Sequence, residues 1–392
     1  MIPYGRQWIT TEDISSVVDV LKSDFLTQGP AVATFETSIK AACGVSHALA
    51  VNSATSALHI ACLGLGLKPG KHLWTSPISF VASSNVGLLC GAEVNFVDID
   101  PETLCMCPDK LAEALAAAEQ AGTLPHIVMP VHFGGQSSDM KAIHALSQKY
   151  GFHIIEDASH AIGAGYDGAR VGDCRYSDAC VFSFHPVKIV TTAEGGVVTT
   201  QSEELATQMD LLRSHGVTRN PDLMTREGDG PWYYQQVELG LNYRMTDMQA
   251  ALGASQMTRL DEFVDLRHTR AEAYDVAFAD MPIQIQKREP ENRSALHLYP
   301  VQIMAQGADR PVKRRQLFEY LRANGVGVNV HYIPIHTQPY YQNLGFSEGQ
   351  FPAAEHYYAG AISLPLHPQL TDADHAHVIN AVRDGLKETG LS

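Results

Sequence analysis

Short apolar segments alternate with helical patterns over the first two thirds of the chain. Most of these segments end in a polar or small residue, a pattern typical of an α/β fold with a mainly parallel sheet. Ligands bind such sheets at the carboxyl ends of the strands. We therefore predict a binding site where these segments end. The predicted strands are residues 47–51, 72–75, 93–98, 126–132, 153–157, 180–184 and 195–200.

The pattern changes near residue 245. The sequence Thr246-Asp247-Met248-Gln249 has the form of a capping box, and it leads into one long helical pattern that continues to Phe278. A chain of 392 residues is long enough for two domains. We predict a large α/β domain at residues 1–245, and a linking helix with a smaller α+β domain at residues 246–392. In the smaller domain we predict strands at 296–303 and 326–335 and helices at 311–324 and 371–387.

The formal net charge of −15 limits the classes of partner that the protein can bind. A sequence-independent grip on nucleic acid or on an anionic membrane requires a basic surface, so we predict neither partner. No run is long and apolar enough to span a bilayer, and the first residues lack the apolar core of a secretory signal. We therefore predict a cytoplasmic protein that binds small molecules.

The seven cysteines include no CxxC pair, which favours reduced thiols over a disulfide framework. Cys105 and Cys107 are two residues apart and could be imagined as metal ligands. No second pair matches them, and a zinc site needs four ligands or three with an open position. We predict no metal site.

A lysine and an aspartate carry the candidate chemistry. Asp157 ends the predicted strand at 153–157, and Lys188 follows the predicted strand at 180–184. A lysine amine forms a Schiff base with the aldehyde of pyridoxal phosphate, and a carboxylate facing the pyridine nitrogen keeps the ring protonated. Taken singly, Asp157 could cap a turn and Lys188 could be an ordinary solvated lysine. Together they predict an aminotransferase.

Small hydroxyl residues follow the first predicted strand. The sequence Asn52-Ser53-Ala54-Thr55-Ser56-Ala57-Leu58 opens a helical pattern that continues to Leu63. A helix start leaves backbone amides free and favours an anion such as a phosphate group. Ser and Thr are also the common helix caps, so this signal is weak by itself.

Seven motifs, taken in order, resemble the sugar aminotransferase family called DegT/DnrJ/EryC1. The resemblance covers nearly the whole chain, from Tyr4 to Pro334. It implies the aspartate aminotransferase fold, which is PLP fold type I, and a homodimer with two shared active sites. The motifs are residues 52–58, 76–82, 156–160, 183–188, 192–196, 213–216 and 242–247.

The resemblance also implies a role for individual residues. Lys188 matches the Schiff-base lysine, where related sugar dehydratases carry a histidine, and Asp157 matches the partner of the pyridine nitrogen. His160 matches the residue beside the phenolic oxygen of the cofactor, and Phe80 the aromatic ring that stacks on the pyridine. The residues that match the phosphate site are Ala54, Thr55 and Ser183, with Asn242 lent by the other subunit.

Three of these assignments have ordinary alternatives. His160 could be a hydrogen-bonded interior histidine, and Phe80 could belong to the core. Asn242 could stabilise a turn before the following helix.

Within the family, the motifs are most similar to the branch that acts in pseudaminic acid biosynthesis. That branch implies an amino acid donor, glutamate, and a UDP-linked 4-keto-6-deoxy-N-acetyl hexose that is aminated at carbon 4, with pyridoxamine phosphate as the intermediate form of the cofactor. The product would be UDP-4-amino-4,6-dideoxy-N-acetyl-β-L-altrosamine. Because the protein is acidic, local cations must bind the anionic diphosphate. The candidate substrate-binding residues are Tyr4, Arg213, His215, Arg219 and His331.

Two alternatives stay open. The chain could aminate another nucleotide-linked keto sugar, as in perosamine or aminoarabinose pathways, or it could be a PLP-binding regulator without catalysis. The segment 222–236 is longer than the family pattern and contains Trp232, Tyr233 and Tyr234. Loops near a site often set specificity, so this segment leaves the identity of the sugar open.

Overall fold

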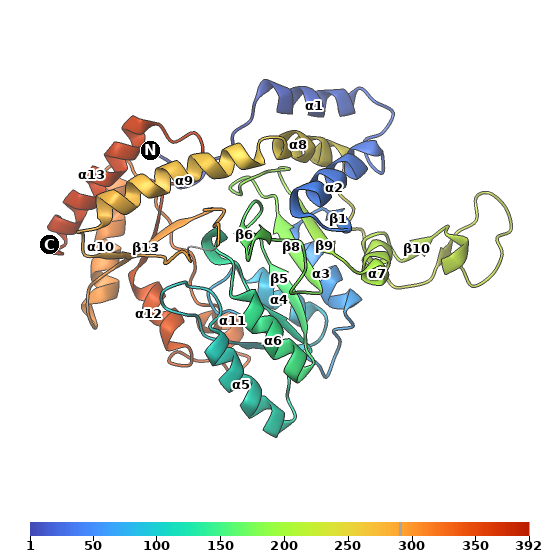
Figure 1. Cartoon of the computed structure of the whole chain (residues 1–392), viewed down its shortest axis with the longest axis horizontal. Coiled ribbons are helices and arrows are strands. Elements are labelled where there is room, and N and C mark those ends of the chain that lie inside the picture. The colour runs from blue at the N-terminus through green and yellow to red at the C-terminus, as the bar shows by residue number, and fades with distance from the viewer. Residues whose placement is uncertain (290–291, 392) are drawn as a thin grey trace.

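The computed structural model describes residues 1–289 and 292–391. Its centre is a seven-stranded sheet in the order β1-β9-β8-β5-β4-β2-β3 (Figure 1). All neighbouring pairs from β3 to β8 are parallel, and β9 runs antiparallel to both β8 and β1. The predicted mainly parallel sheet is therefore confirmed. Its strands are β1 (His47–Val51), β2 (His72–Thr75), β3 (Glu93–Phe96), β4 (Ile127–Met129), β5 (His153–Asp157), β8 (Ala179–Ser183) and β9 (Gly196–Thr200).

Three strands end earlier than predicted, of which β8 ends one residue early, at Ser183. β4 stops at Met129 because Pro130 has no backbone N–H to donate to a ladder. The chain then continues to His132 outside the sheet, although the His132 N–H still bonds the Asp157 carbonyl at 3.0 Å. β3 stops at Phe96, two residues before the predicted end at 98. Beyond these strands, the Asp98 carboxylate accepts from the Ala353 and Ala354 N–H groups, and His132 Nε2 bonds the Glu156 carboxylate.

The sheet separates two apolar cores. In β8, Cys180 and Phe182 point into one core, and Ala179 and Val181 point into the other, as the two-residue period of a strand requires. Helices cover both faces (Figure 1). They are α1 (Thr11–Leu21), α2 (Pro30–Cys43), α3 (Ala54–Gly64), α4 (Ala82–Leu89), α5 (Pro108–Ala121), α6 (Met140–Tyr150) and α7 (Glu203–Arg213).

The predicted linking helix is two helices. The capping box is present, since the Thr246 side chain accepts from the Gln249 N–H and starts α8 (Asp247–Met257). Residues 258 and 259 then separate α8 from α9 (Leu260–Phe278). α9 contributes Phe263 to a core of the large sheet and Tyr274 to the core of the smaller sheet, so it connects the two.

The C-terminal part contains a three-stranded antiparallel sheet in the order β12-β13-β14. The strand predicted at 326–335 is wrong. Val326 and Asn329 make single bridges to Ile2 and Ser363, and the rest of the segment borders a cavity instead of entering a sheet. The predicted division at residue 245 stays a prediction. The elements are β12 (Ile283–Ile285), β13 (Tyr299–Ile303), α10 (Asp309–Ala323), α11 (Pro339–Gln342), α12 (Pro352–Gly360), β14 (Ala361–Leu364) and α13 (Asp372–Glu388).

A hairpin projects from the body beyond α7 (Figure 1). It is formed by β10 (Val217–Thr218) and β11 (Gln235–Gln236), which pair with each other. The segment 222–236 lies in this hairpin, where Trp232 is 71% exposed. We call residues 217–236 the arm.

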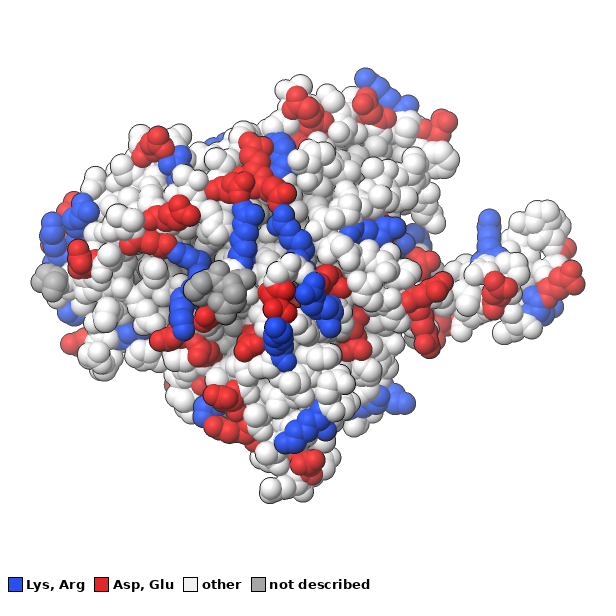
Figure 2. Space-filling view, viewed as in Figure 1, with Lys and Arg blue, Asp and Glu red and all other residues white. Residues whose placement is uncertain are grey.

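The surface in Figure 2 shows lysines and arginines interspersed with aspartates and glutamates, without a continuous basic area on that face. None of the helices in the described residues is long and apolar enough to cross a membrane. No group of three or more His, Cys, Asp or Glu residues in the described ranges is arranged to hold a metal ion.

Candidate active site

A cavity of about 590 Å³ lies at the carboxyl ends of the parallel strands. It brings together residues that are far apart in the sequence, from the N-terminal segment to the segment after Val326. Nine of the residues selected from the sequence line it. They are Tyr4, Ala54, Thr55, Phe80, Asp157, His160, Ser183, Lys188 and His331.

Lys188 ends a tight turn after β8. Its backbone N–H bonds the His185 carbonyl at 2.9 Å, and Pro186 occupies the second position of the turn, where its fixed φ is favourable. Burial lowers the pKa of the Lys188 amine to about 8, and the negative charge of Asp157 opposes this shift. The amine is therefore neutral in a larger fraction of molecules than a solvated lysine would be.

Asp157 is the last residue of β5 and is 4% exposed. Its Oδ2 accepts a hydrogen bond from the Ser83 hydroxyl at 2.6 Å. Its Oδ1 accepts from the Ser159 hydroxyl at 2.6 Å and from the Ser159 N–H at 3.1 Å. These three donors compensate the burial of the carboxylate and fix its direction toward the cavity.

The imidazole of His160 is neutral, and its tautomer is defined by its neighbours. Burial and the nearby positive charge of Lys188 hold the pKa of His160 well below its usual value. Nδ1 accepts from the Gly134 N–H at 3.3 Å, so Nε2 carries the hydrogen and donates to the Tyr332 hydroxyl at 3.1 Å. The ring thus presents a hydrogen-bond donor to the cavity.

The N-terminus of α3 forms one end of the cavity. Ser53 caps the helix by accepting from the Ser56 N–H at 3.1 Å, and the amides of Ala54 and Thr55 belong to the first turn, which has no intrahelical acceptors. A Cβ on Gly196 would lie 2.5 Å from the Ser53 carbonyl, so glycine allows β9 to approach this helix start. With Ser183 beside it, this end is suited to an anion.

Aromatic rings form the opposite wall. Phe80 is 61% exposed, and its ring centroid is 6.4 Å from that of Tyr332. The ring of Tyr4 lies 5.2 Å from that of His331. Burial and the charge of Lys188 lower the pKa of His331 to about 3, so His331 lines the cavity as a neutral group and not as the expected cation.

Four selected residues do not line this cavity in the same chain, namely Arg213, His215, Arg219 and Asn242. Arg213 donates to Glu36 Oε1 at 2.6 Å and to the Ala50 carbonyl at 2.8 Å, while Glu36 accepts from the Ala50 N–H. This ion pair covers the open edge of β1 and gives Arg213 a structural role, while its predicted substrate contact stays a prediction. His215 and Asn242 lie at the base of the arm, where their segments pair with each other.

Sequence reasoning missed several residues of the cavity. Ser83 and Ser159 hold the central carboxylate, and Tyr332 bonds His160. His297 also lines the cavity, with its ring centroid 4.4 Å from that of His160. Ser159 stood inside a motif selected from the sequence and Tyr332 inside a predicted strand, but His297 precedes β13 with no local signal of its own.

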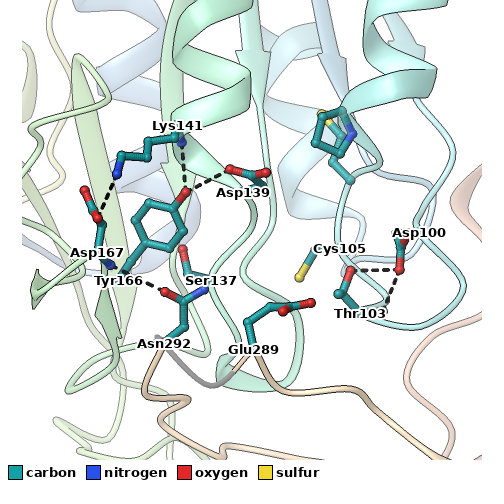
Figure 3. A pocket seen from close by; sticks show the side chains of 12 residues that line it. Asp100, Thr103, Cys105, Ser137, Asp139, Lys141, Tyr166, Asp167, Glu289 and Asn292 are labelled. Atoms are coloured by element: carbon teal, nitrogen blue, oxygen red, sulfur yellow. Dashed lines mark hydrogen bonds and ion pairs between the residues drawn. The ribbon is translucent and has the colours of Figure 1, made fainter.

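A second cavity of about 460 Å³ lies between the loop after β3 and the start of α6. Figure 3 shows hydrogen bonds and ion pairs among several of its polar groups. The Tyr166 hydroxyl donates to Asp139 at 2.8 Å, and Lys141 pairs with Asp167 at 2.8 Å. The charged groups named here are already paired with their neighbours, and we assign no chemistry to this cavity.

Comparisons with known proteins agree with the geometry. The profile of the DegT/DnrJ/EryC1/StrS aminotransferase family matches residues 7–383. The spore coat polysaccharide biosynthesis protein SpsC of Bacillus subtilis is 39% identical over 98% of this chain and 97% of its own length. The UDP-4-amino-4,6-dideoxy-N-acetyl-beta-L-altrosamine transaminase of Campylobacter jejuni is 36% identical over 95% of this chain and 94% of its own.

Solved structures give the same result. Helicobacter pylori PseC, an aminotransferase involved in the biosynthesis of pseudoaminic acid, superposes with a TM-score of 0.90 at 30% identity, covering 99% of both chains. The putative sugar aminotransferase Spr1654 of Streptococcus pneumoniae, in its PMP form, also gives 0.90, at 28% identity over 99% of this chain and 100% of its own. The aspartate aminotransferase fold expected from the sequence is thus confirmed.

Proposed function

The chain belongs to the DegT/DnrJ/EryC1/StrS aminotransferase family, and we propose that it transfers an amino group from L-glutamate to carbon 4 of a UDP-linked 4-keto-6-deoxy-N-acetyl hexose. The product would be UDP-4-amino-4,6-dideoxy-N-acetyl-β-L-altrosamine, a precursor in pseudaminic acid biosynthesis. Pyridoxal phosphate is the cofactor of this family, and the chain is a PLP-dependent sugar aminotransferase. The donor, the nucleotide and the sugar are the proposed part.

The donor set of the cavity fits the cofactor. Pyridoxal phosphate, when bound, supplies an aldehyde that condenses with amines and a protonated ring that withdraws electrons from the reacting carbon. Lys188 offers a partly neutral amine, and Asp157 a buried carboxylate. The first turn of α3, at Ala54 and Thr55, together with Ser183, offers amides and hydroxyls for a phosphate group. This combination in one cavity carries the proposal.

We assign proton transfer to Lys188. Its amine takes the α-proton of the amino acid donor and returns it, and in the second half of the cycle it moves a proton in the reverse direction. A pKa of about 8 leaves roughly a tenth of the amine neutral at pH 7, far more than for a solvated lysine. When the cofactor is bound, the Nε2–H of His160, which donates to the Tyr332 hydroxyl in this structure, would turn to its phenolic oxygen, and the exposed ring of Phe80 would stack on its pyridine.

The similarity to the Campylobacter jejuni transaminase supports the proposed sugar. Tyr4 and the neutral His331 lie at the aromatic wall, where they would contact the sugar ring and not its diphosphate. Among the described residues that line the cavity, Lys188 is the single lysine or arginine. The cationic partners of the diphosphate therefore come from outside this set.

We propose a homodimer whose two chains complete each other's sites. Asn242 lies outside the cavity of its own chain, at the base of the arm, and would be lent to the phosphate end of the partner's cavity. The free thiols of all seven cysteines support a reducing compartment, the cytoplasm.

A second candidate is amination of a different keto sugar. SpsC, named for spore coat polysaccharide biosynthesis, is 39% identical, against 36% for the Campylobacter jejuni transaminase. This difference is too small to separate two sugars, and the arm that could decide specificity differs from the expected pattern.

A panel of UDP-, GDP- and dTDP-linked 4-keto sugars, incubated with glutamate and followed by mass spectrometry, tests the proposal. We expect the UDP-linked N-acetyl hexosulose to be aminated fastest, with the amine at carbon 4. Faster amination of another nucleotide sugar would favour the second candidate function, amination of a different keto sugar. Borohydride trapping with peptide mapping should place the cofactor on Lys188, and absence of that tag would overturn the assignment of the site.

A further inference from the structure

The hydrogen bonds that hold Asp157 continue one residue beyond Ser83. The Ser83 hydroxyl donates to Asp157 Oδ2 at 2.6 Å, and its oxygen lies 2.6 Å from the hydroxyl oxygen of Ser79. Ser79 is 4% exposed and lines the same cavity as Asp157. Two hydroxyl groups therefore lead in series to the central carboxylate. We call Ser79 and Ser83 the serine pair.

The direction of each hydrogen bond in this series can be assigned by counting hydrogens. An ionised carboxylate only accepts, so the single hydroxyl hydrogen of Ser83 is directed to Asp157. The bond between the two serines must then use the hydrogen of Ser79, because Ser83 has no second hydroxyl hydrogen. Ser79 thus donates to Ser83, and Ser83 donates to Asp157.

Ser83 has a second acceptor within reach. The Phe80 carbonyl lies 3.3 Å from Ser83 Oγ, so rotation of the hydroxyl can direct its hydrogen to the backbone and away from Asp157. A hydroxyl that accepts a hydrogen bond donates a stronger one, since hydrogen bonds in series polarise one another. The gain is larger toward a charged acceptor. The hydrogen bond from Ser79 therefore favours the direction of Ser83 that serves the carboxylate.

The contacts of its loop hold Ser79 in place. The loop connects β2 to α4, and Ile78, the preceding residue, is fully buried in an apolar cluster. The Pro77 carbonyl accepts from the Ile335 N–H at 2.9 Å. Moving Ser79 away from Ser83 would disturb both contacts. The serine pair is therefore a fixed part of the cavity wall.

We propose that Ser79 is a positioning residue of the active site, which acts through Ser83 to direct Asp157 Oδ2 toward the ring nitrogen of the cofactor. The inference deepens the proposed function and rests on Asp157 as the partner of that nitrogen. Ser159 holds the other carboxylate oxygen, so the serine pair acts on Oδ2 alone. Ser79 needs no contact with the reacting carbon to have this effect.

Two ligands that differ only at the ring nitrogen test this role. The probes are pyridoxal phosphate and the analogue in which CH replaces that nitrogen, and their binding to the full, cofactor-free chain is followed by absorbance. Wild type should bind pyridoxal phosphate more tightly. In Ser79→Ala we expect this affinity to fall by about threefold to tenfold, as for the loss of one hydrogen bond, while the affinity for the analogue stays unchanged.

Three results would refute the proposal. One is equal affinity of wild type for both ligands, which would mean that Asp157 does not hold the nitrogen. The others are an unchanged affinity of Ser79→Ala for pyridoxal phosphate, and an equal loss for both ligands, which would indicate general damage to the cavity.

Further variants separate positioning from a structural role. Ser79→Thr keeps the hydroxyl and should restore the affinity, whereas Ser79→Cys, with a weak S–H donor, should show the selective loss seen in Ser79→Ala. Combined with Ser83→Ala, Ser79→Ala should cost no further affinity, because its effect passes through the Ser83 hydroxyl. Losses that multiply in the double variant would show that Ser79 acts independently of Ser83, against the proposal.

Ser84→Ala is the matched control. Ser84 is buried in the same helix as Ser83, but its hydroxyl bonds that of Tyr341 at 2.5 Å, and neither residue lines the cavity. Its preference for pyridoxal phosphate over the analogue should equal that of wild type, and a changed preference would count against a specific role of Ser79. No nucleotide sugar or amino donor enters these titrations, so failure of the sugar panel would count against the proposed function and not against the serine pair.

Discussion

The hydroxyl of Ser83 donates to Asp157 Oδ2 over 2.6 Å, although the two residues are 74 positions apart in the sequence. Ser83 lies in the first turn of α4, just after Phe80, and Asp157 ends β5. The helix that follows the exposed aromatic ring therefore also orients the carboxylate. Two contacts proposed for the cofactor, at the face of its ring and at its nitrogen, are thus mechanically connected.

Ser83→Ala should weaken the site without unfolding the chain. The buried Asp157 would lose one of three donors, which costs about 1–3 kcal/mol. We expect reduced cofactor affinity and a rate lower by about one to two orders of magnitude. Absorbance titration with pyridoxal phosphate and steady-state kinetics measure the two effects. Ser23→Ala, at an exposed position outside the cavity, serves as the control. Equal affinity in both variants would contradict this reading of the contact.

Lys188→Ala and Asp157→Asn should fail in different ways. Without the Lys188 amine there is no proton carrier, so turnover should be lost. Asp157→Asn keeps the size of the side chain but not its charge, and it should retain some bound cofactor while losing most of its rate. Rapid mixing with glutamate separates the two, since Asp157→Asn should convert the visible absorption band slowly and Lys188→Ala should not convert it. Normal turnover in Lys188→Ala would end the assignment.

The reactivity of Lys188 should rise near pH 8. The amine is nucleophilic only when neutral, and the neutral fraction grows as the pH passes upward through a pKa of about 8. Labelling of Lys188 in the cofactor-free chain should therefore reach half its maximum near that pH. Exposed Lys110 provides an internal comparison, because its partner Glu113 raises its pKa. Equal midpoints for both lysines would mean that the cavity does not shift the amine.

Gly196→Ala should damage the phosphate end of the cavity. The new methyl group would lie 2.5 Å from the Ser53 carbonyl and 2.6 Å from the Ala54 nitrogen, and both are backbone atoms that cannot rotate away. We expect loss of cofactor binding and a lower melting temperature. Gly165→Ala meets its nearest atom at 3.4 Å and is the matched control. Calorimetry with and without cofactor would show whether Gly196 matters only to folding.

Arg213→Met should reduce stability and leave the KM for the sugar unchanged. The side chain covers the edge of β1 through Glu36 and the Ala50 carbonyl, and its loss leaves Glu36 without its counter-charge and the Ala50 carbonyl without this donor. A cost of about 1–3 kcal/mol is expected in denaturant unfolding. Arg315→Met, at an exposed residue of α10, should change neither quantity. A raised KM with wild-type stability would restore Arg213 as a substrate ligand.

Mixing two inactive variants tests the shared sites. Lys188→Ala and Asn242→Ala chains, each weakly active or inactive alone, should regain activity after mixed refolding. Half of the randomly formed dimers are mixed, and each would contain one intact site and one doubly altered site, which gives about a quarter of wild-type activity. Absence of recovery, with mixed dimers demonstrated by tagged purification, would show that each chain completes its own site.

The sequence was sufficient where a local pattern decides structure. β1, β2 and β5 match their predicted bounds, and Asp157, Lys188 and the start of α3 meet in one cavity as the strand ends require. It failed where tertiary contacts decide. Residues 326–335 have the apolar pattern of a strand. Their apolar side chains pack against the cavity and the small core, but their backbone does not join a sheet.

Charged residues were harder to interpret. Arg213 stands in a family motif and was expected to bind substrate, yet its guanidinium completes the hydrogen bonds of an edge strand. His297 precedes β13 in an apolar stretch, so only the fold shows that it lines the same cavity as Lys188. One-dimensional patterns report periodicity and capping, whereas the partner of a long polar side chain is chosen in three dimensions.

Helix α9 has a consequence for how this enzyme is put together. Its 19 residues span about 28 Å, with Phe263 embedded among the residues of the large sheet and Tyr274 among those of the small one. Because α9 packs into both cores, we expect the two sheets to move little relative to each other. The space between them should then keep its dimensions through the catalytic cycle. To change the sugar specificity, substitutions should therefore be made in the lining of that space. Substitutions that alter hinge motion should have little effect on specificity.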